Sequence, residues 1–264
     1  MDLQLRNKKA LVTGSTAGIG FAIAQKLASE GAVVVINGRT EERVQEAIEQ
    51  IKKTDPQAQL IGVAADISKK EEISKLIQEV KEVDILVNNA GIYEVKAFLE
   101  ISDEDWFHMF DVNVMSGVRL SRHYLSAMLK NNWGRIIFIS SESALQIPGE
   151  MVHYGMSKTA QLAVARGIAE NLVGTNITVN SVLPGPTRSE GVNQFINNLG
   201  KSQHKTSEQI EEEFFATVRP SSLIKRFATS EEVANMVAYL SSPLASATHG
   251  ASVRVDGGVI RSIA

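Results

Sequence analysis

Three polar side chains in this 264-residue chain have the types and spacing needed for proton transfer. Tyr154 and Lys158 lie four residues apart, a spacing that places both on one face of a helix. The pKa of a free tyrosine is about 10, and a neighbouring ammonium favours the phenolate and lowers it. Ser141 stands thirteen residues before Tyr154, at the end of an apolar run where an α/β sheet presents its site. Together they predict acid–base chemistry on an oxygen atom.

A glycine-rich turn, Thr13-Gly14-Ser15-Thr16-Ala17-Gly18-Ile19-Gly20, follows one apolar run and precedes a helical pattern. Glycines there let the backbone approach a pyrophosphate, and the helix N-terminus adds N–H donors and partial positive charge. The spacing is GxxxGxG and not GxGxxG, and such turns also serve packing alone. The turn therefore predicts a dinucleotide site only in combination with other features.

Arg39 is such a feature. The second strand is expected to end at Asn37-Gly38-Arg39, about twenty residues after the glycine turn, where a dinucleotide fold reads the adenosine ribose. An acidic residue would bind a 2′-hydroxyl there, whereas the Arg39 guanidinium suits a 2′-phosphate. NADP(H) is therefore favoured over NAD(H). The alternative is that Arg39 pairs with Glu41 or Glu42 on the surface.

The segments that must position these residues alternate between short β-branched runs and amphipathic stretches, which is the pattern of βαβ units and a parallel sheet. We expect strands at 10–13, 33–37, 60–64, 85–88, 135–140, 178–183 and 252–255, and helices at 19–30, 41–53, 69–81, 103–130, 151–173 and 231–241. Capping-box spacing, Ser68 with Glu71 and Thr229 with Glu232, marks two helix starts.

Residues 187–226 break this rhythm, with no expected strand and with signs of helices of their own. Such excursions usually form lids or binding loops, the alternative being a solvated helical excursion. Candidate apolar wall residues are Phe195, Ile196, Leu199, Phe214 and Phe215. Candidate partners for an anionic tail are Arg188, Lys201, His204, Lys205 and Arg219.

Composition excludes several classes of protein. The 27 Lys+Arg and 30 Asp+Glu give a net charge of −3, which argues against a nucleic-acid partner. The chain has no Cys, so disulfides, thiolate metal sites and cysteine nucleophiles are absent, and we expect no metal. No signal peptide or membrane span is expected, and the default expectation is a cytoplasmic protein.

Eight motifs, in order along the chain, resemble those of the short-chain dehydrogenase/reductase family from Leu5 to Arg261. They are TGSTAGIG at 13–20, Asp66-Ile67, NNAG at 88–91, Asn113, Ser141, Tyr154 with Lys158, Pro184-Gly185 with Thr187, and Val255-Asp256-Gly257-Gly258. The resemblance implies one Rossmann-like domain over residues 1–264, a doubly wound seven-stranded parallel sheet with helices on both faces. It also implies a substrate lid at about 187–226 and assembly as a homotetramer or homodimer.

The resemblance further implies a role for each matching position. Tyr154 would be the general acid in carbonyl reduction or the base in alcohol oxidation, with Ser141 on the same oxygen. Lys158 would bind the nicotinamide ribose and lower the pKa of Tyr154, and Asn113 would hold a water that links Lys158 to solvent. The cofactor would also contact Gly14, Ser15, Thr16, Ile19 and Gly20 at the phosphates, Asp66 and Ile67 at the adenine, Asn89, Ala90 and Gly91 along the ribose, and Pro184, Gly185 and Thr187 at the carboxamide.

The chain departs from the family pattern at a few positions. Many NADP-dependent relatives carry a basic residue where this chain has Ala17, so Arg39 beside Asn37 would need help from the hydroxyls of Ser15 and Thr40. Glu142 follows the serine; it is either solvated, paired with Arg188, or a carboxylate that disfavours acidic substrates. His153 is expected to be a packing residue.

Two neighbouring serines compete for one role. Consecutive strand residues face opposite ways, so only one of Ser140 and Ser141 can face the cofactor. The family's thirteen-residue offset to Tyr154 selects Ser141.

We therefore expect an NADP(H)-dependent oxidoreductase acting on a small carbonyl or secondary alcohol, with a 3-oxoacyl reductase as one variant. The alternatives are a dinucleotide-binding regulator with little turnover and an NAD-dependent alcohol dehydrogenase.

Overall fold

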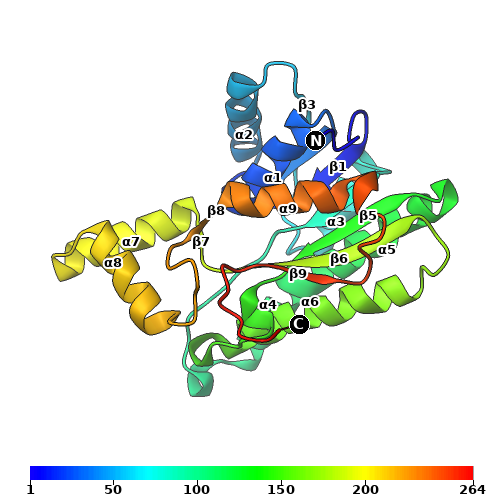
Figure 1. Cartoon of the computed structure of the whole chain (residues 1–264). Helices are drawn as coiled ribbons and strands as arrows, with labels where there is room; N and C mark the ends of the chain where they lie inside the picture. Colours follow the sequence, from blue (N-terminus) through cyan, green and yellow to red (C-terminus); the bar gives the residue numbers. More distant parts are fainter. Residues whose placement is uncertain (264) are drawn as a thin grey trace.

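Seven parallel strands form one sheet in the computed structural model, which describes residues 1–263 apart from the side chains of Glu190 and Phe195 (Figure 1). In sheet order they are β3 (Gln59–Ala64), β2 (Val33–Gly38), β1 (Lys9–Val12), β4 (Ile85–Asn88), β5 (Gly134–Ile139), β6 (Ile177–Pro184) and β9 (Ser252–Val255). The predicted doubly wound α/β fold is confirmed, and every predicted strand is present with ends shifted by at most one residue.

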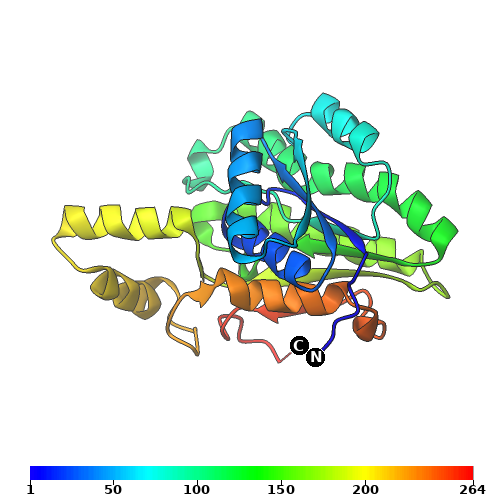
Figure 2. The same cartoon turned by 90° about the horizontal axis from the view of Figure 1, so that it is seen from above.

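Helices cover both faces of this sheet (Figures 1 and 2). One face carries α1 (Gly18–Ser29), α2 (Glu41–Thr54) and α9 (Ser230–Ser241), and the other carries α3 (Lys70–Glu79), α5 (Ser116–Asn131) and α6 (Val152–Glu170). The five central strands are apolar on both sides because each face packs against its own buried core, whereas the edge strands β3 and β9 are less buried. Across residues 1–263, none of the helices has both the length and the apolar character needed to cross a bilayer.

The strand order reverses at β1, which pairs with β2 on one side and β4 on the other. Val12 is thus in register with both Ile36 and Val87. Because the chain leaves these strands toward opposite faces, a crevice opens at their carboxyl ends, where open α/β sheets bind ligands. The motif residues of the sequence lie around this crevice.

The helix expected at 103–130 is wrong in one respect, because it is interrupted. The segment contains α4 (Asp103–Phe110), a π-helical turn at Asp111–Met115, and α5. Asn113 lies in this turn, and its side chain exchanges two hydrogen bonds with the backbone of Ile92, at 2.8 and 2.9 Å. Hydrophobic periodicity cannot reveal such a turn, because one wider turn leaves the apolar stripe nearly unchanged.

Of the two predicted capping boxes, only the second is present. At α9 the Thr229 side chain caps the Glu232 backbone, and the Glu232 carboxylate accepts from the Thr229 N–H. The Ser68 box is wrong, since Lys69 is the N-cap of α3 and its side chain makes no cap bond. The Ser68 hydroxyl donates instead to Asp66, at 2.7 Å.

Residues 187–229, here called the arm, leave the sheet and return to it. The prediction that this stretch holds no strand is wrong, because β7 (Thr187–Arg188) pairs in parallel with β8 (Ala228–Thr229) at its base. The predicted helices are present as α7 (Glu190–Gln203) and α8 (Ser207–Glu213), followed by a π-helical turn at Phe214–Val218. Figure 2 shows α7 and α8 projecting away from the sheet.

Candidate active site

The glycine turn between β1 and α1 exposes backbone donors. Gly14 and Gly18 have φ of +61° and +57°, a conformation that favours glycine. A Cβ on Gly20 would lie 2.3 Å from the Gly14 carbonyl oxygen, so the turn closes only without a side chain there. Ala17, the N-cap of α1, offers no side-chain bond, which leaves the first N–H groups of the helix available to an anion.

Asn37 ties this turn to the sheet. Its Oδ1 accepts from the Gly14 N–H at 3.2 Å, and its Nδ2 donates to the carbonyls of Val63 and Ala65. The Ser15 hydroxyl is buried and accepts from the Asn37 N–H at 2.9 Å. The expected help of the Ser15 hydroxyl toward a 2′-phosphate is therefore wrong, because this hydroxyl is turned into the protein.

Two arginines face a cavity of about 580 Å³ at the carboxyl end of β2, here called the Arg39 cavity. Arg39 and Arg43 both line it, and within the described residues Arg39 forms no ion pair, so its suggested pairing with Glu41 or Glu42 is absent. Thr40 does not line this cavity; its hydroxyl accepts from the Arg43 N–H and caps α2. Sequence reasoning missed Arg43, although its place in the first helical turn after Arg39 could have indicated it.

The other side of the Arg39 cavity is formed by the loop after β3. Burial raises the pKa of the Asp66 carboxyl, but hydrogen bonds from Ser68 and the charges of Lys69 and Arg39 outweigh this, so the pKa lies below its ordinary value. Of the predicted cofactor residues, those that line this cavity are Gly14, Thr16, Asn37, Arg39, Asp66, Ile67, Asn89, Ala90 and Gly91.

Tyr154 and Lys158 share one face of α6, as predicted from their spacing. The Lys158 ammonium lies 5.6 Å from the centre of the Tyr154 ring and donates to the Ile139 carbonyl at 2.9 Å. Burial lowers the pKa of Lys158 to about 8. Burial also raises the pKa of Tyr154 to about 12, so the expected lowering by Lys158 is not what the structure shows.

The two serines after β5 have different partners. The Ser140 hydroxyl donates to the Lys158 carbonyl at 2.9 Å and so anchors α6 to the sheet. Ser141 lines the same cavity as Tyr154, and a hydrogen bond between their side chains opposes the burial that raises the pKa of Tyr154. This geometry agrees with the choice of Ser141 over Ser140.

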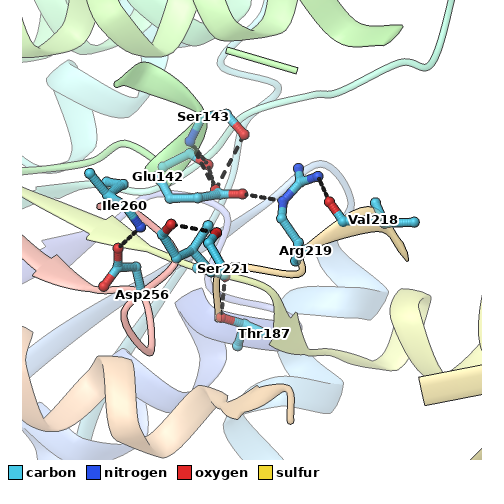
Figure 3. Close-up of polar contacts among 11 residues, drawn as sticks. Glu142, Ser143, Thr187, Val218, Arg219, Ser221, Asp256 and Ile260 are labelled. Carbon is cyan, nitrogen blue, oxygen red and sulfur yellow. Dashed lines mark hydrogen bonds and ion pairs between the residues drawn. The ribbon is translucent and has the colours of Figure 1, made fainter. Parts of the chain in front are cut away.

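Glu142 is buried and binds the arm (Figure 3). Its carboxylate accepts from the Ser141 hydroxyl at 2.5 Å and pairs with Arg219 Nε at 3.1 Å. Glu142 is therefore neither solvated nor paired with Arg188, which pairs with Glu211 instead. The sequence could not show this contact, because its partners are 77 residues apart.

His153 is a packing residue, as expected. It is fully buried, and its ring meets Trp106 edge-on with centroids 5.9 Å apart. Its nearest acidic neighbour is Glu94, at 3.8 Å.

The Asn113 side chain lies beside Gly91, at the edge of the site. A Cβ on Gly91 would lie 3.1 Å from Asn113 Oδ1 and 3.5 Å from Lys158 Nζ, so both polar atoms flank this glycine. The Gln161 side chain donates to the Asn113 carbonyl at 2.6 Å. Gln161 was not predicted, although it stands one helical turn after Lys158.

The loops after β4 and β6 complete the floor of the crevice. The Thr13 hydroxyl accepts from the N–H groups of Asn89 and Ala90, each at 3.0 Å, which joins the NNAG loop to the glycine turn. Gly185 packs closely on Asp256: a Cβ added to Gly185 would lie 2.6 Å from the carbonyl oxygen of Asp256. Asp256 in turn accepts from the N–H groups of Gly258 and Ile260, and Figure 3 shows the bond from Ile260.

A second cavity, of about 250 Å³ and here called the Tyr154 cavity, continues from the first. The predicted residues that line it are Ile19, Asn89, Gly91, Ser141, Tyr154, Lys158, Pro184, Gly185 and Thr187. It shares Asn89 and Gly91 with the Arg39 cavity, so the two form one groove along the carboxyl ends of the strands.

A third cavity, of about 510 Å³ and here called the arm cavity, meets the groove at Ser141 and Tyr154. Its wall is largely apolar and includes Ile196, Leu199 and Phe214 of the predicted set. Phe215 packs inside the arm instead, and the side chain of Phe195 lies outside the described residues. Of the cations proposed for an anionic tail, Arg219 alone lines the cavity within the described part of the chain.

This arrangement of fold and groove is that of a known class of enzyme. Residues 8–219 match the sequence profile of the short chain dehydrogenase family, and the chain belongs to that family.

Its similarity to individual members extends over the full length. The chain is 49% identical to the uncharacterized oxidoreductase YvaG of Bacillus subtilis, with both chains covered completely. It is 35% identical to the 3-oxoacyl acyl-carrier-protein reductase FabG of Aquifex aeolicus, over 98% of this chain and 100% of FabG. The crystal structure of L-sorbose reductase from Gluconobacter frateurii, in complex with NADPH and L-sorbose, superposes with a TM-score of 0.94 at 31% identity and covers both chains completely.

Proposed function

We propose that this protein is an NADP(H)-dependent oxidoreductase that interconverts a carbonyl compound and a secondary alcohol. One observation carries the proposal: Ser141 and Tyr154 stand at the junction of the groove along the strand ends and the apolar arm cavity. A substrate oxygen at this junction meets a proton-transfer group on one side and the nicotinamide end of the groove on the other.

The groove fits a nicotinamide dinucleotide. Glycine at positions 20 and 185 lets the backbone pack closely at the glycine turn and against Asp256, and the first N–H groups of α1 are available to a pyrophosphate. Arg39 and Arg43 supply two cations where a 2′-phosphate would lie, and no acidic residue replaces them at the end of β2. NADPH in the structurally similar L-sorbose reductase supports the same preference. When bound, the cofactor supplies or accepts the hydride.

The chain's own residues supply orientation and the proton. In the reducing direction the Tyr154 phenol donates its proton to the substrate oxygen, and in the oxidising direction the phenolate accepts it. Ser141 holds the same oxygen in place. Lys158 binds the ribose hydroxyls beside Gly91, and Asn113 holds the backbone of Ile92 at the edge of that site. A water held beside Asn113 would connect Lys158 to solvent.

The arm cavity favours a substrate with an apolar part. Its wall comes mainly from aliphatic and aromatic side chains of the arm, so the arm acts as the substrate lid. Both a 3-oxoacyl compound and a smaller hydroxyketone are candidates, since relatives of each kind are similar to this chain.

A substrate panel tests the proposed function. We expect purified protein to oxidise NADPH, followed by its absorbance, with at least one class among ketones, aldehydes, 3-oxoacyl thioesters and hydroxyketones. A tight NADPH complex without turnover on the whole panel, including secondary alcohols with NADP, would instead favour a dinucleotide-binding regulator.

We also propose a homo-oligomer, a homotetramer or a homodimer. Phe107 and Phe110, which are 73% and 37% exposed, lie one helical turn apart on α4 and offer apolar surface that a second copy would cover. Light scattering coupled to size exclusion tests this, and a monomer at micromolar concentration would contradict it.

A further inference from the structure

The carboxylate of Glu142 is surrounded by donors, although it directly follows the serine of the site. Its Oε2 accepts from the Ser141 hydroxyl at 2.5 Å, from the Ser143 N–H at 2.9 Å and from the Ser143 hydroxyl at 3.2 Å. Its Oε1 accepts from Arg219 Nε at 3.1 Å (Figure 3). A carboxamide has a single acceptor oxygen, so only a carboxylate satisfies donors on both sides.

Arg219 belongs to the arm and not to the sheet. It stands directly after the π-helical turn at Phe214–Val218, where the arm returns toward the sheet. Its side chain is 11% exposed, and its guanidinium also donates to the Val218 carbonyl at 3.0 Å. The ion pair is therefore largely withdrawn from water, where charge interactions are stronger than on the surface.

The bond to Glu142 fixes what Ser141 can do. The Ser141 hydroxyl donates its one proton to Glu142, and its oxygen also accepts from the Ser143 N–H at 3.1 Å. A hydroxyl has two lone pairs, so one acceptor site remains on Ser141. A substrate carbonyl oxygen can only accept, so the Ser141 proton must turn from Glu142 to that oxygen during reduction, while the bond from the Ser143 N–H keeps the Ser141 oxygen in place.

We propose that Glu142 and Arg219 are a pair of positioning residues, which join the arm to Ser141 and hold its side chain beside Tyr154 until the hydroxyl turns its proton to a substrate oxygen. This inference rests on the proposed oxidoreductase function. Arg219 and Glu142 also line the arm cavity, so the pair closes the polar end of an otherwise apolar wall.

The two charges act on Tyr154 in opposite directions. Glu142 raises the pKa of the Tyr154 phenol, whereas Arg219 lowers it. Removing one member alone thus shifts the pH dependence of proton transfer as well as its geometry, and the direction of the shift identifies the member that was removed.

The experiment compares Glu142→Gln, Arg219→Met and their double variant with Arg219→Lys, which keeps the cation. Arg226→Met is the matched control, because Arg226 pairs with Glu232 near the base of the same arm but does not line the cavity. Each variant is assayed for kcat, KM and NADPH affinity, and its melting temperature is measured to confirm folding.

We expect Glu142→Gln and Arg219→Met each to lower kcat by about tenfold or more, with KM and NADPH affinity changed by less than about threefold. The double variant should be no slower than the slower single variant, because the two residues act as one unit. Arg219→Lys should recover most of the lost activity, and Arg226→Met should match the wild type.

In alcohol oxidation, the pH at which kcat/KM reaches half its plateau should fall in Glu142→Gln and rise in Arg219→Met. Additive losses, or pH profiles that stay fixed or move in the same direction, would overturn the inference. If Glu142→Gln does not fold, the Arg219→Met and Arg219→Lys profiles decide the question. A wild-type protein without turnover would overturn the proposed function, whereas active variants like the wild type refute only the positioning pair.

Discussion

Lys158 donates to the Ile139 carbonyl at 2.9 Å, with its ammonium 5.6 Å from the centre of the Tyr154 ring. Lys158 is buried and Tyr154 is partly buried, and loss of hydration moves their pKa values toward the uncharged forms, to about 8 for Lys158 and about 12 for Tyr154. The site therefore holds its proton donor protonated at neutral pH, the state required for carbonyl reduction.

Replacing Lys158 with Met should make the protein inactive but more stable. At pH 7 a buried ammonium opposes folding, so the variant's free energy of unfolding should be higher by about 1–2 kcal/mol. Between pH 8 and 10.5 the unfolded chain binds the Lys158 proton more tightly than the folded chain does, so wild-type stability should rise with pH relative to the variant. Urea unfolding at several pH values measures this, and a constant difference across the window would contradict it.

Replacing Tyr154 with Phe should remove the proton donor while leaving the ring. We expect kcat to fall about 10²–10⁴-fold, with NADPH affinity nearly unchanged. Replacing Ser141 with Ala should lower kcat about 10²-fold, since the hydroxyl that holds the oxygen is lost. Ser140→Ala is the control, and a Ser140 variant that is inactive beside an active Ser141 variant would reverse their assignment.

Replacing Arg39 with Asp should shift the cofactor preference from NADP(H) toward NAD(H). The carboxylate repels a 2′-phosphate and accepts from a 2′-hydroxyl, so NADPH affinity should drop at least about tenfold. The separate variant Arg43→Ala should also weaken NADPH binding, and its affinity for NADH should be unchanged. Fluorescence titration measures both affinities, with Lys53→Asp at the far end of α2 as the control. Equal binding of the two cofactors in wild type and variants would refute the phosphate role.

Replacing Asn113 with Ala should weaken both fold and reaction. The N–H and C=O of Ile92 lose their partners, so we expect a loss of about 1–3 kcal/mol in the free energy of unfolding. The activity per folded molecule should fall as well. Asn131→Ala, the same change at the exposed end of α5, should do neither. An Asn113→Ala variant with full stability would show that the π-helical turn does not depend on this side chain.

Much of the fold could be predicted from the sequence, because the strands are continuous apolar runs and the helices amphipathic segments. The predicted helix bounds differ from the structure where a local hydrogen bond competes with the capping or hydrophobic pattern. Ser68 has the spacing of a helix cap but bonds to Asp66, and Asn113 widens a helical turn that periodicity reads as continuous. The pairing of β7 with β8 joins residues about forty positions apart, beyond the reach of local signals.

The site was predictable where a motif places a residue just after a strand, as at Gly14 and Ser141, or one helical turn from its partner, as with Tyr154 and Lys158. It was not predictable where a side chain depends on a distant partner. The Glu142–Arg219 pair and the buried hydroxyl of Ser15 both depend on contacts that only the folded chain forms. The raised pKa of Tyr154 likewise follows from burial, which spacing alone does not reveal.

The short ladder of β7 and β8 has a consequence for how this protein acquires its specificity. Thr187 is in register with Ala228, and Arg188 with Thr229, so the two ends of the arm are held side by side while the arm itself lies outside the sheet. Helices α7 and α8 can be exchanged as one module, since the seven strands make no use of them and Arg219, which holds Glu142, lies after both helices. A new cavity wall would then face unchanged hydride and proton chemistry.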